Sequence, residues 1–344
     1  MNKKVIDDVI KKAIEDEVFP GAAIASGTKD SILFSEVYGN RQLIPRKKIM
    51  TTNTMFDIAS ISKLVTTFIV LKLVEDGKLS LKDKITKFFN VPKDKEDITI
   101  EHLMTHTGGL AAHIMISDFT DDPKKVAEVI LNSDLSYKLG EQVEYSCLGF
   151  ILLGKIAEMA GGQDFDILAN QIVFNPLSMN QSVYNPSPEF EYAVTEYDNE
   201  KGKWLEGVVH DENARFMGGV SGNAGVFSNL NDMQKFAQML TRNGEPIISK
   251  KLFDQAITNH TKFSDEGRGL GFLVKHKTVI SCGNIFGEGS FGHTGFTGTS
   301  IWVDINTGLY VVFLTNRVHP VRANTKLIEF RKVIHDTVIS EYVS

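Results

Sequence analysis

Ser60 and Lys63 stand three residues apart in a segment that could carry out nucleophilic catalysis. An apolar run follows them and continues through Leu73, which predicts a helix that begins near Ser60. On a helix, Lys63 would lie one turn from Ser60 and on the same face. A serine hydroxyl needs a nearby base to become a nucleophile, and an amine at this spacing can supply one. The alternative interpretation is a helix-capping serine followed by a solvated lysine.

Two later segments also carry residues of catalytic type. Tyr145 falls in a loop directly before an apolar helix predicted at residues 149–160, so its phenol could project into a cleft. A glycine-rich strand near the C-terminus contains His293, Thr294 and Gly295. Glycines in a strand let a ligand or another backbone approach closely. Taken alone, the tyrosine also fits simple packing, and the strand also fits a sheet edge with a bulge.

The pattern of elements predicts how the fold holds these segments together. Residues 3–17 have the spacing of an amphipathic helix, and two strand-type runs separated by a turn at 28–30 follow, which favours a hairpin. Helix and loop signals dominate from about residue 78 to 260. The chain closes with a helix at 324–343. Before that helix, strand-type runs occur at 270–276, 278–282, 290–294, 299–304 and 309–315.

This order predicts an α/β (α+β) fold in which both ends of the chain build one antiparallel sheet flanked by helices. A mainly helical region is inserted between the two ends. We therefore expect a sheet domain made of residues 1–77 and 262–344 and a helical domain made of residues 78–261. The active site should lie at their interface, since such interfaces are favoured places for ligand sites.

The composition is that of an ordinary globular protein, with 344 residues of which 42% are hydrophobic and 23% are charged. A formal net charge of −6 argues against nucleic acid as a partner. The apolar runs are far shorter than the ~20 residues that a membrane span needs, which argues against a membrane partner. The two cysteines, Cys147 and Cys282, lack metal-ligand spacing, and the N-terminus lacks the apolar run of a signal peptide. We therefore expect a cytoplasmic location, and these patterns leave the oligomeric state open.

Three motifs, in chain order, resemble the signature of serine β-lactamases, penicillin-binding proteins and related carboxylesterases. The motifs are Ser60-x-x-Lys63, Tyr145-x-Cys147 and His293-Thr294-Gly295. The resemblance is closest to the class C β-lactamase-like group and extends through nearly the whole chain, with further landmarks at residues 98–110, 173–179 and 314–320. It implies the β-lactamase/DD-peptidase fold. It also implies a serine hydrolase that acts through an acyl-enzyme on small-molecule or peptide substrates, at an ester or amide bond, without a cofactor or metal.

The resemblance also implies roles for single residues. Ser60 would attack the substrate carbonyl, and Lys63 would accept its proton if burial or a like charge lowers the lysine pKa. Tyr145 would protonate the leaving group and then activate the deacylating water. The backbone N–H groups of Ser60 and Phe296 would hold the oxyanion, with the Phe296 side chain free to vary. The other substrate-contacting residues that the resemblance implies are His293, Thr294, Gly295 and Cys147.

Two residues depart from the signature. Cys147 stands where the family has asparagine, and a thiol is a weak donor and acceptor for a substrate amide. His293 stands where many relatives have lysine, and a histidine of ordinary pKa carries little positive charge at pH 7. Both changes weaken the case for β-lactam and anionic peptide substrates, and they favour simple esters.

Several alternatives stay open. The chain could be a true β-lactamase or D-alanyl peptidase, or a weakly active binding or sensor domain that uses the same cleft. Cys147 could itself be a nucleophile with His106 or His293 as its base. His106 begins a second His-Thr-Gly, but His293 follows the other two motifs in order. The run His210 to Glu212 could ligate a metal, although adjacent residues rarely converge on one ion.

Overall fold

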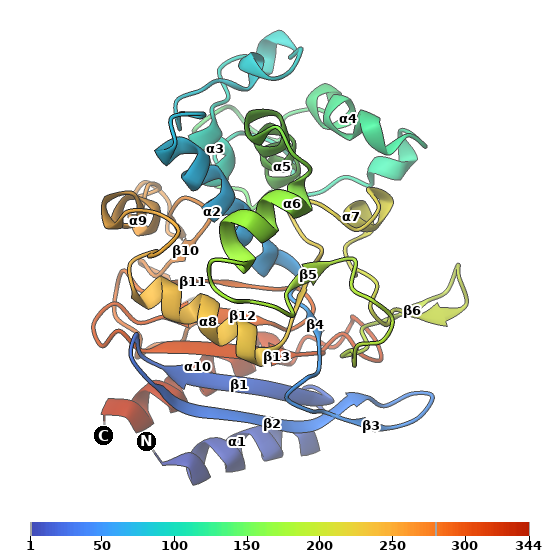
Figure 1. Ribbon diagram of the computed structural model, residues 1–344, viewed down its shortest axis with the longest axis vertical. Helices are drawn as coiled ribbons and strands as arrows, with labels where there is room; N and C mark the ends of the chain where they lie inside the picture. Colours follow the sequence, from blue (N-terminus) through green and yellow to red (C-terminus); the bar gives the residue numbers. More distant parts are fainter. Residues whose placement is uncertain (1, 279–280, 344) are drawn as a thin grey trace.

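An eight-stranded antiparallel sheet organises the protein, whose computed structural model describes residues 2–278 and 281–343 (Figure 1). Its strand order is β3-β2-β1-β13-β12-β11-β10-β9, so strands from the two ends of the chain meet where β1 pairs with β13. The fold class expected from the sequence is therefore confirmed. The strands are β1 (Gly21–Gly27), β2 (Ile32–Gln42), β3 (Lys48–Ile49), β9 (Gly267–Arg268), β10 (Leu273–Val274), β11 (Phe291–Thr294), β12 (Ser300–Val303) and β13 (Tyr310–Thr315).

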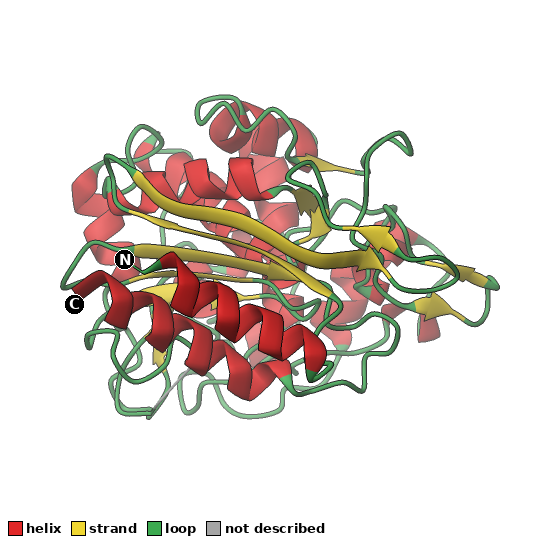
Figure 2. Ribbon diagram, turned by 90° about the horizontal axis from the view of Figure 1, so that it is seen from below, coloured by secondary structure: helices red, strands yellow, loops and turns green. Residues whose placement is uncertain are grey.

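Helices α1 (Lys3–Glu15) and α10 (Leu327–Val343) lie side by side on one face of this sheet (Figure 2). Alternate strand residues such as Ile24 and Phe313 pack against these helices, while their neighbours Ala25 and Val312 face the opposite core. Strands covered on both faces are apolar throughout, which explains why β1 and β13 read as continuous apolar runs.

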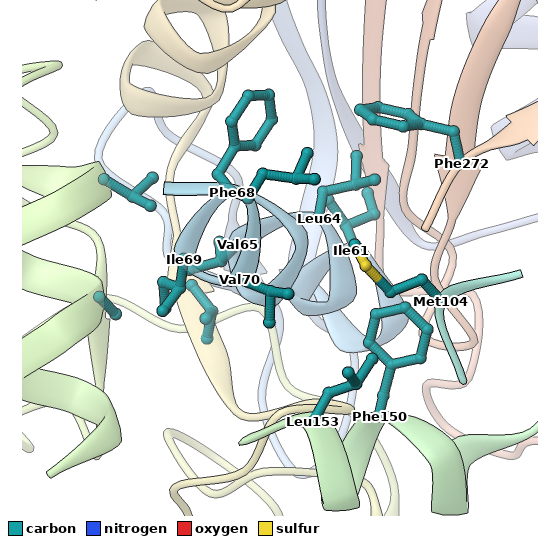
Figure 3. Packing of buried hydrophobic residues seen from close by; sticks show 14 of the residues in the cluster. Ile61, Leu64, Val65, Phe68, Ile69, Val70, Met104, Phe150, Leu153 and Phe272 are labelled. Atoms are coloured by element: carbon teal, nitrogen blue, oxygen red, sulfur yellow. The ribbon is translucent and has the colours of Figure 1, made fainter. Parts of the chain in front are cut away.

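Helix α2 (Ser62–Glu75) lies in the core on the other side of the sheet. All its residues from Ser62 to Leu71 are buried, and Figure 3 shows apolar side chains of other elements, among them Phe150 and Phe272, packed around it. A helix that is apolar all round belongs in a protein interior. Because Lys63 is part of this helix, the fold carries a lysine into the core.

The middle of the chain is mainly helical, as the sequence predicts. Its helices are α3 (Ile100–Met104), α4 (Val126–Asn132), α5 (Cys147–Gly161), α6 (Phe165–Ala169), α7 (Glu212–Phe216), α8 (Leu230–Thr241) and α9 (Lys250–Ile257). Its short strands are β5 (Val183–Tyr184), β6 (Tyr197–Asp198), β7 (Lys203–Trp204) and β8 (Val226–Ser228), and β8 also pairs with β4 (Phe56–Asp57). Helix α8 packs on β1, β12 and β13 of the large sheet. The domain boundaries proposed from the sequence stay a prediction.

Two strand predictions before β11 differ from the structure. The run 270–276 contains only the two-residue strand β10, and of the run 278–282, residues 279–280 lie outside the described residues and Ser281 and Cys282 form a turn. The segment that follows is held by α10 instead, where Asp336 accepts hydrogen bonds from the N–H groups of Asn284 and Ile285. No described helix is long and apolar enough to cross a bilayer.

Candidate active site

Ser60 lies in a tight 3₁₀ turn (Ala59–Ile61) that leads directly into α2. The preceding Ala59 has φ of +48°, a left-handed conformation that a non-glycine residue seldom adopts. Buried Asp57 supports this turn, since one carboxylate oxygen accepts from Ala59 N–H at 2.8 Å and the other from His210 N–H at 2.7 Å. The turn therefore presents the Ser60 hydroxyl at the N-terminal end of α2.

Lys63 contacts Ser60 as the spacing predicts. Its Nζ lies 3.0 Å from Ser60 Oγ, 3.0 Å from the backbone oxygen of Asn223 and 3.5 Å from Cys147 Sγ, and the side chain is fully buried. A neutral amine fits this arrangement, because two N–H groups can donate to Asn223 and Cys147 while its lone pair accepts the Ser60 proton. The same geometry also accommodates an ammonium that donates to all three partners.

The surroundings of Lys63 act on its pKa in two opposite directions. Burial lowers the pKa of Lys63, but the interaction with Tyr145 and Cys147 whenever either is ionised acts in the opposite direction and leaves that pKa above its ordinary value. Lys63 and Tyr145 therefore titrate together, and the charge on one sets the pKa of the other. A proton must leave the group formed by Lys63 and Tyr145 before Ser60 can be deprotonated.

Tyr145 lies beside this lysine, directly before Ser146, the N-cap of α5. Lys63 Nζ is 4.9 Å from the centroid of the Tyr145 ring. The centroid of the His293 ring is 5.9 Å from the same Tyr145 centroid. Burial raises the pKa of Tyr145, and the Lys63 charge lowers it by a smaller amount. The phenol is therefore protonated at rest and can act as a proton donor.

His293 is neutral in this structure. Its Nδ1–H donates to the Thr294 backbone oxygen at 2.8 Å, so Nε2 carries a lone pair, which has no hydrogen-bond partner among the described residues. The side chain is 2% exposed, and burial next to Lys63 lowers the pKa of His293 to about 3. The sequence suggests a weak positive charge here, whereas the structure provides a hydrogen-bond acceptor.

The turn after β11 packs against the Ser60 segment. A Cβ atom on Gly295 would lie 2.5 Å from the Ile58 backbone oxygen and 2.1 Å from Thr299 Oγ1, so this position requires glycine. Thr299 Oγ1 in turn donates to the Ile58 oxygen at 3.0 Å. These contacts place the backbone of Phe296 beside the turn that carries Ser60, where an oxyanion site needs a second N–H group.

The Phe296 side chain is also held in place. Its ring stacks on His210 with centroids 5.4 Å apart, and the Arg317 guanidinium lies 4.7 Å from its centroid. The half-exposed ring therefore forms part of the cleft wall, and the expectation that this side chain is free to vary stays a prediction.

An open cleft of about 780 Å³ brings the predicted residues together. From the predicted set, it is lined by Ser60, Tyr145, Cys147, His293, Thr294, Gly295 and Phe296. Lys63 lies beneath it, in contact with Ser60 and Cys147. For the alternative of a Cys147 nucleophile, the structure gives the thiol a hydrogen bond with Lys63 and none with His106 or His293 among the described residues, so the proposed histidine bases gain no support.

Sequence reasoning missed several residues of the site. Arg268 is 4% exposed, lies 5.2 Å from the centroid of the Tyr145 ring and pairs with Glu266. Arg331 of α10 donates to the Gly295 backbone oxygen at 2.7 Å and so supports the oxyanion turn. Both arginines are distant in sequence from the three motifs. The sequence feature that could have indicated them is an arginine within a glycine-rich run, for Arg268, or within an apolar run, for Arg331.

The run from His210 to Glu212 does not converge on a common point. His210 Nε2 lies 3.1 Å from the Glu196 carboxylate. Asp211 accepts a hydrogen bond from Ala214 N–H at 2.8 Å. Glu212 forms an ion pair with Arg322. Within residues 2–278 and 281–343, no three His, Cys, Asp or Glu side chains gather as a metal site.

We expect stability to fall as the pH is lowered from 7 to 5. Burial lowers the pKa of His293 to about 3 and that of His335 to about 4, so the unfolded chain binds these protons more tightly than the folded protein. Their stabilisation is complete above pH 6.5, and at pH 5 each loses about 2 kcal/mol. Asp57, whose pKa burial raises to about 6, acts oppositely and restores about 1 kcal/mol.

Denaturant unfolding at pH 7 and pH 5 checks this, with an expected net loss of at least roughly 3 kcal/mol, because burial also lowers the pKa of His106 and adds to the loss. The matched variant is His335→Asn, because His335 is fully buried and lies outside the cleft. Its unfolding free energy should depend on pH less steeply by about 2 kcal/mol over the same range. Equal pH dependence in wild type and variant would contradict the assignment.

The comparisons with known proteins agree with this geometry. A family model described as "Beta-lactamase" matches residues 6–335. The chain belongs to the beta-lactamase family. A Bacillus subtilis (strain 168) protein named N-acetylmuramyl-L-alanine amidase is 29% identical over 360 residues, which cover 91% of this chain and 80% of the relative. A Salmonella enteritidis PT4 protein that carries a D-alanyl-D-alanine carboxypeptidase name is 30% identical over 332 residues, covering 86% and 76%.

Solved structures share the fold of this beta-lactamase family member. An octameric penicillin-binding protein homologue from Pyrococcus abyssi has a TM-score of 0.78 at 24% identity, covering 97% of this chain and 78% of that one. EstCE1, described as a hydrolase with promiscuous acyltransferase activity, has a TM-score of 0.77 at 19% identity, covering 97% and 98%. The prediction of a serine hydrolase that works through an acyl-enzyme is thereby confirmed. The roles of single residues stay a prediction.

Proposed function

We propose that Ser60 is the nucleophile of this hydrolase and that Lys63 and Tyr145 handle its protons. The observation that carries the proposal is the 3.0 Å contact between Lys63 Nζ and Ser60 Oγ at a fully buried lysine. After one proton leaves Lys63 and Tyr145, Ser60 can transfer its own proton to them while Oγ bonds to the substrate carbonyl carbon. The N–H groups of Ser60 and Phe296 then hold the oxyanion, and Tyr145 returns a proton to the leaving group.

We further propose that simple esters are preferred over β-lactams. Cys147 occupies the position from which the family's asparagine would bind a substrate amide, and its thiol is already directed toward Lys63 at 3.5 Å. His293, neutral with its pKa near 3, offers no positive charge to a substrate carboxylate. A simple ester needs neither the hydrogen bond to a substrate amide nor the positive charge for a carboxylate, and its alkoxide leaving group departs more readily than an amine.

The test is a panel of a p-nitrophenyl ester, nitrocefin and a D-alanyl peptide, run on wild type and Cys147→Asn. We expect wild type to turn over the ester with the highest kcat/KM. Cys147→Asn should improve nitrocefin and peptide turnover relative to the ester by about 10-fold, the worth of one hydrogen bond. Cys147→Ser, which lacks an amide, is the matched control. Nitrocefin turnover above that of the ester in wild type would overturn the ester preference.

A D-alanyl carboxypeptidase is the second candidate, and Arg268 is the observation that favours it. This arginine is buried and lies at the same cleft beside Tyr145, where it could bind a peptide carboxylate although His293 cannot. The Salmonella relatives carry the corresponding name. If the D-alanyl peptide exceeds the ester in the wild-type panel, this candidate replaces the first.

A further inference from the structure

His106 belongs to the second His-Thr-Gly, which the catalytic assignment leaves unused. It lies just after α3, is 3% exposed and has φ of +58°. Histidine is among the non-glycine residues that tolerate this left-handed region, but the conformation still carries a cost. A buried residue kept in such a conformation needs compensating contacts, and those of His106 lead to Tyr145.

His106 holds the chain on both sides of Tyr145. The N–H of Glu144 donates to the His106 backbone oxygen at 3.0 Å, and the N–H of Ser146 donates to His106 Nδ1 at 3.1 Å. The imidazole also packs on the phenol, with ring centroids 4.8 Å apart. One residue thus binds the N–H groups of the residues on either side of Tyr145 and packs against its ring.

The hydrogen bonds also define the state of the imidazole. Because Nδ1 accepts from a backbone N–H, the neutral ring carries its proton on Nε2, which has no hydrogen-bond partner among the described residues. Burial lowers the pKa of His106 well below its ordinary value, and the charges of Arg268 and Lys63 act in the same direction. The ring therefore excludes water from Tyr145 without adding a charge.

We propose that His106 is the positioning residue for Tyr145, which fixes the phenol against Lys63 and shields it from water. This inference rests on the proposed role of Tyr145 as a proton carrier. It assigns a function to the second His-Thr-Gly that does not involve contact with substrate.

The test measures pH–rate profiles. The burial of Tyr145 helps to set the pH at which Lys63 and Tyr145 together lose one proton, and the profile reports that pH. The other titratable or charged groups that face Tyr145 are Lys63 from α2, Cys147 from α5, Arg268 from β9 and His293 from β11. None of them changes in the variants used. A shift of the ascending limb of kcat/KM therefore reports on the surroundings of Tyr145.

His106→Ala should lower kcat for the ester by about 10- to 100-fold while KM changes by less than about 3-fold, because the acid/base group is misplaced and the cleft is kept. Water admitted beside the phenol stabilises its anion, so the ascending limb should move to lower pH. His106→Asn should restore most of kcat, since an asparagine oxygen can accept from Ser146 N–H and asparagine tolerates positive φ.

His102→Ala is the matched control on the same segment. His102 completes the capping box of α3 with Thr99, so its loss should lower the melting temperature without changing kcat or the pH profile. If His106→Ala does not fold, Tyr137→Phe tests the same inference. The Tyr137 hydroxyl donates to the His106 oxygen at 3.0 Å, and its removal should lower kcat by about 2- to 5-fold and move the limb in the same direction.

Tyr145→Phe separates the two proposals. If it loses activity while the His106 and Tyr137 variants keep wild-type kcat and pH profiles, the positioning inference is overturned and the proposed function stands. An equal loss of kcat in His106→Asn and His106→Ala would also contradict the positioning inference. The acceptor for Ser146 N–H, which histidine and asparagine both supply, would then have no effect on the rate. If Tyr145→Phe remains fully active, the proposed role of Tyr145 fails and the inference fails with it.

Discussion

Replacing Ser60 by alanine is expected to lower kcat/KM for ester substrates by about 10⁴-fold or more, because the change removes the hydroxyl that we propose forms the acyl-enzyme. Ester hydrolysis measures the rate, and intact-mass spectrometry after treatment with a fluorophosphonate measures the covalent step. Wild type should gain one adduct, located on Ser60, and Ser60→Ala should gain none. Ser60 lies half-buried at the cleft, so the fold should tolerate the change.

Ser62→Ala is the control, two residues farther along. Ser62 is buried, and its hydroxyl accepts a hydrogen bond from Val226 N–H at 3.2 Å, so its loss should cost about 1 kcal/mol of stability. The ester rate should stay within about 3-fold of wild type, since the Ser62 hydroxyl bonds to Val226 and does not line the cleft, while Lys63 Nζ bonds to Ser60.

Two results would contradict this assignment in different ways. Folded wild type that forms no adduct would favour the weakly active binding domain that the sequence leaves open. Activity retained in Ser60→Ala but lost in Cys147→Ala would transfer the nucleophile to the thiol, which lies 3.5 Å from Lys63 Nζ.

The fold could be predicted where local patterns are strong. The hairpin of β1 and β2, strands β11 to β13 and helix α10 follow from apolar runs bounded by turns. The segment after β10 could not be predicted, because its backbone groups bind Asp336 from a helix more than fifty residues away. A window of sequence contains no information about such a partner.

In the active site, too, local spacing could be predicted from the sequence, whereas features that depend on distant residues could not. The spacing of Ser60 and Lys63 predicts their contact, since one helical turn fixes it. Charge states depend on what surrounds a side chain, so the raised pKa of Lys63 and the lowered pKa of His293 emerge only from the packed structure. Arg268 and His106 reach Tyr145 from β9 and from the end of α3, and no motif links them to it.

Replacing Lys63 by methionine is expected to lower kcat by about 10³-fold, because the chain would lose the amine that we propose accepts the Ser60 proton. Methionine is close to lysine in length and apolar, so the fully buried site around α2 should keep its packing. Lys95→Met is the matched control. Lys95 is also buried, with a side chain 3% exposed and Nζ 2.9 Å from Asp94, but it lies outside the cleft. Its loss should leave the ester rate unchanged.

The pH profile of Lys63→Met makes the prediction more specific. Burial raises the pKa of Tyr145 and the Lys63 charge lowers it, so removal of that charge raises the pKa further. The ascending limb of the residual activity should therefore move to higher pH, opposite to the shift expected for His106→Ala. Opposite shifts in the two variants require that both residues act on the same phenol. Shifts in one direction, or none, would mean that Lys63 and Tyr145 do not share the proton that limits Ser60.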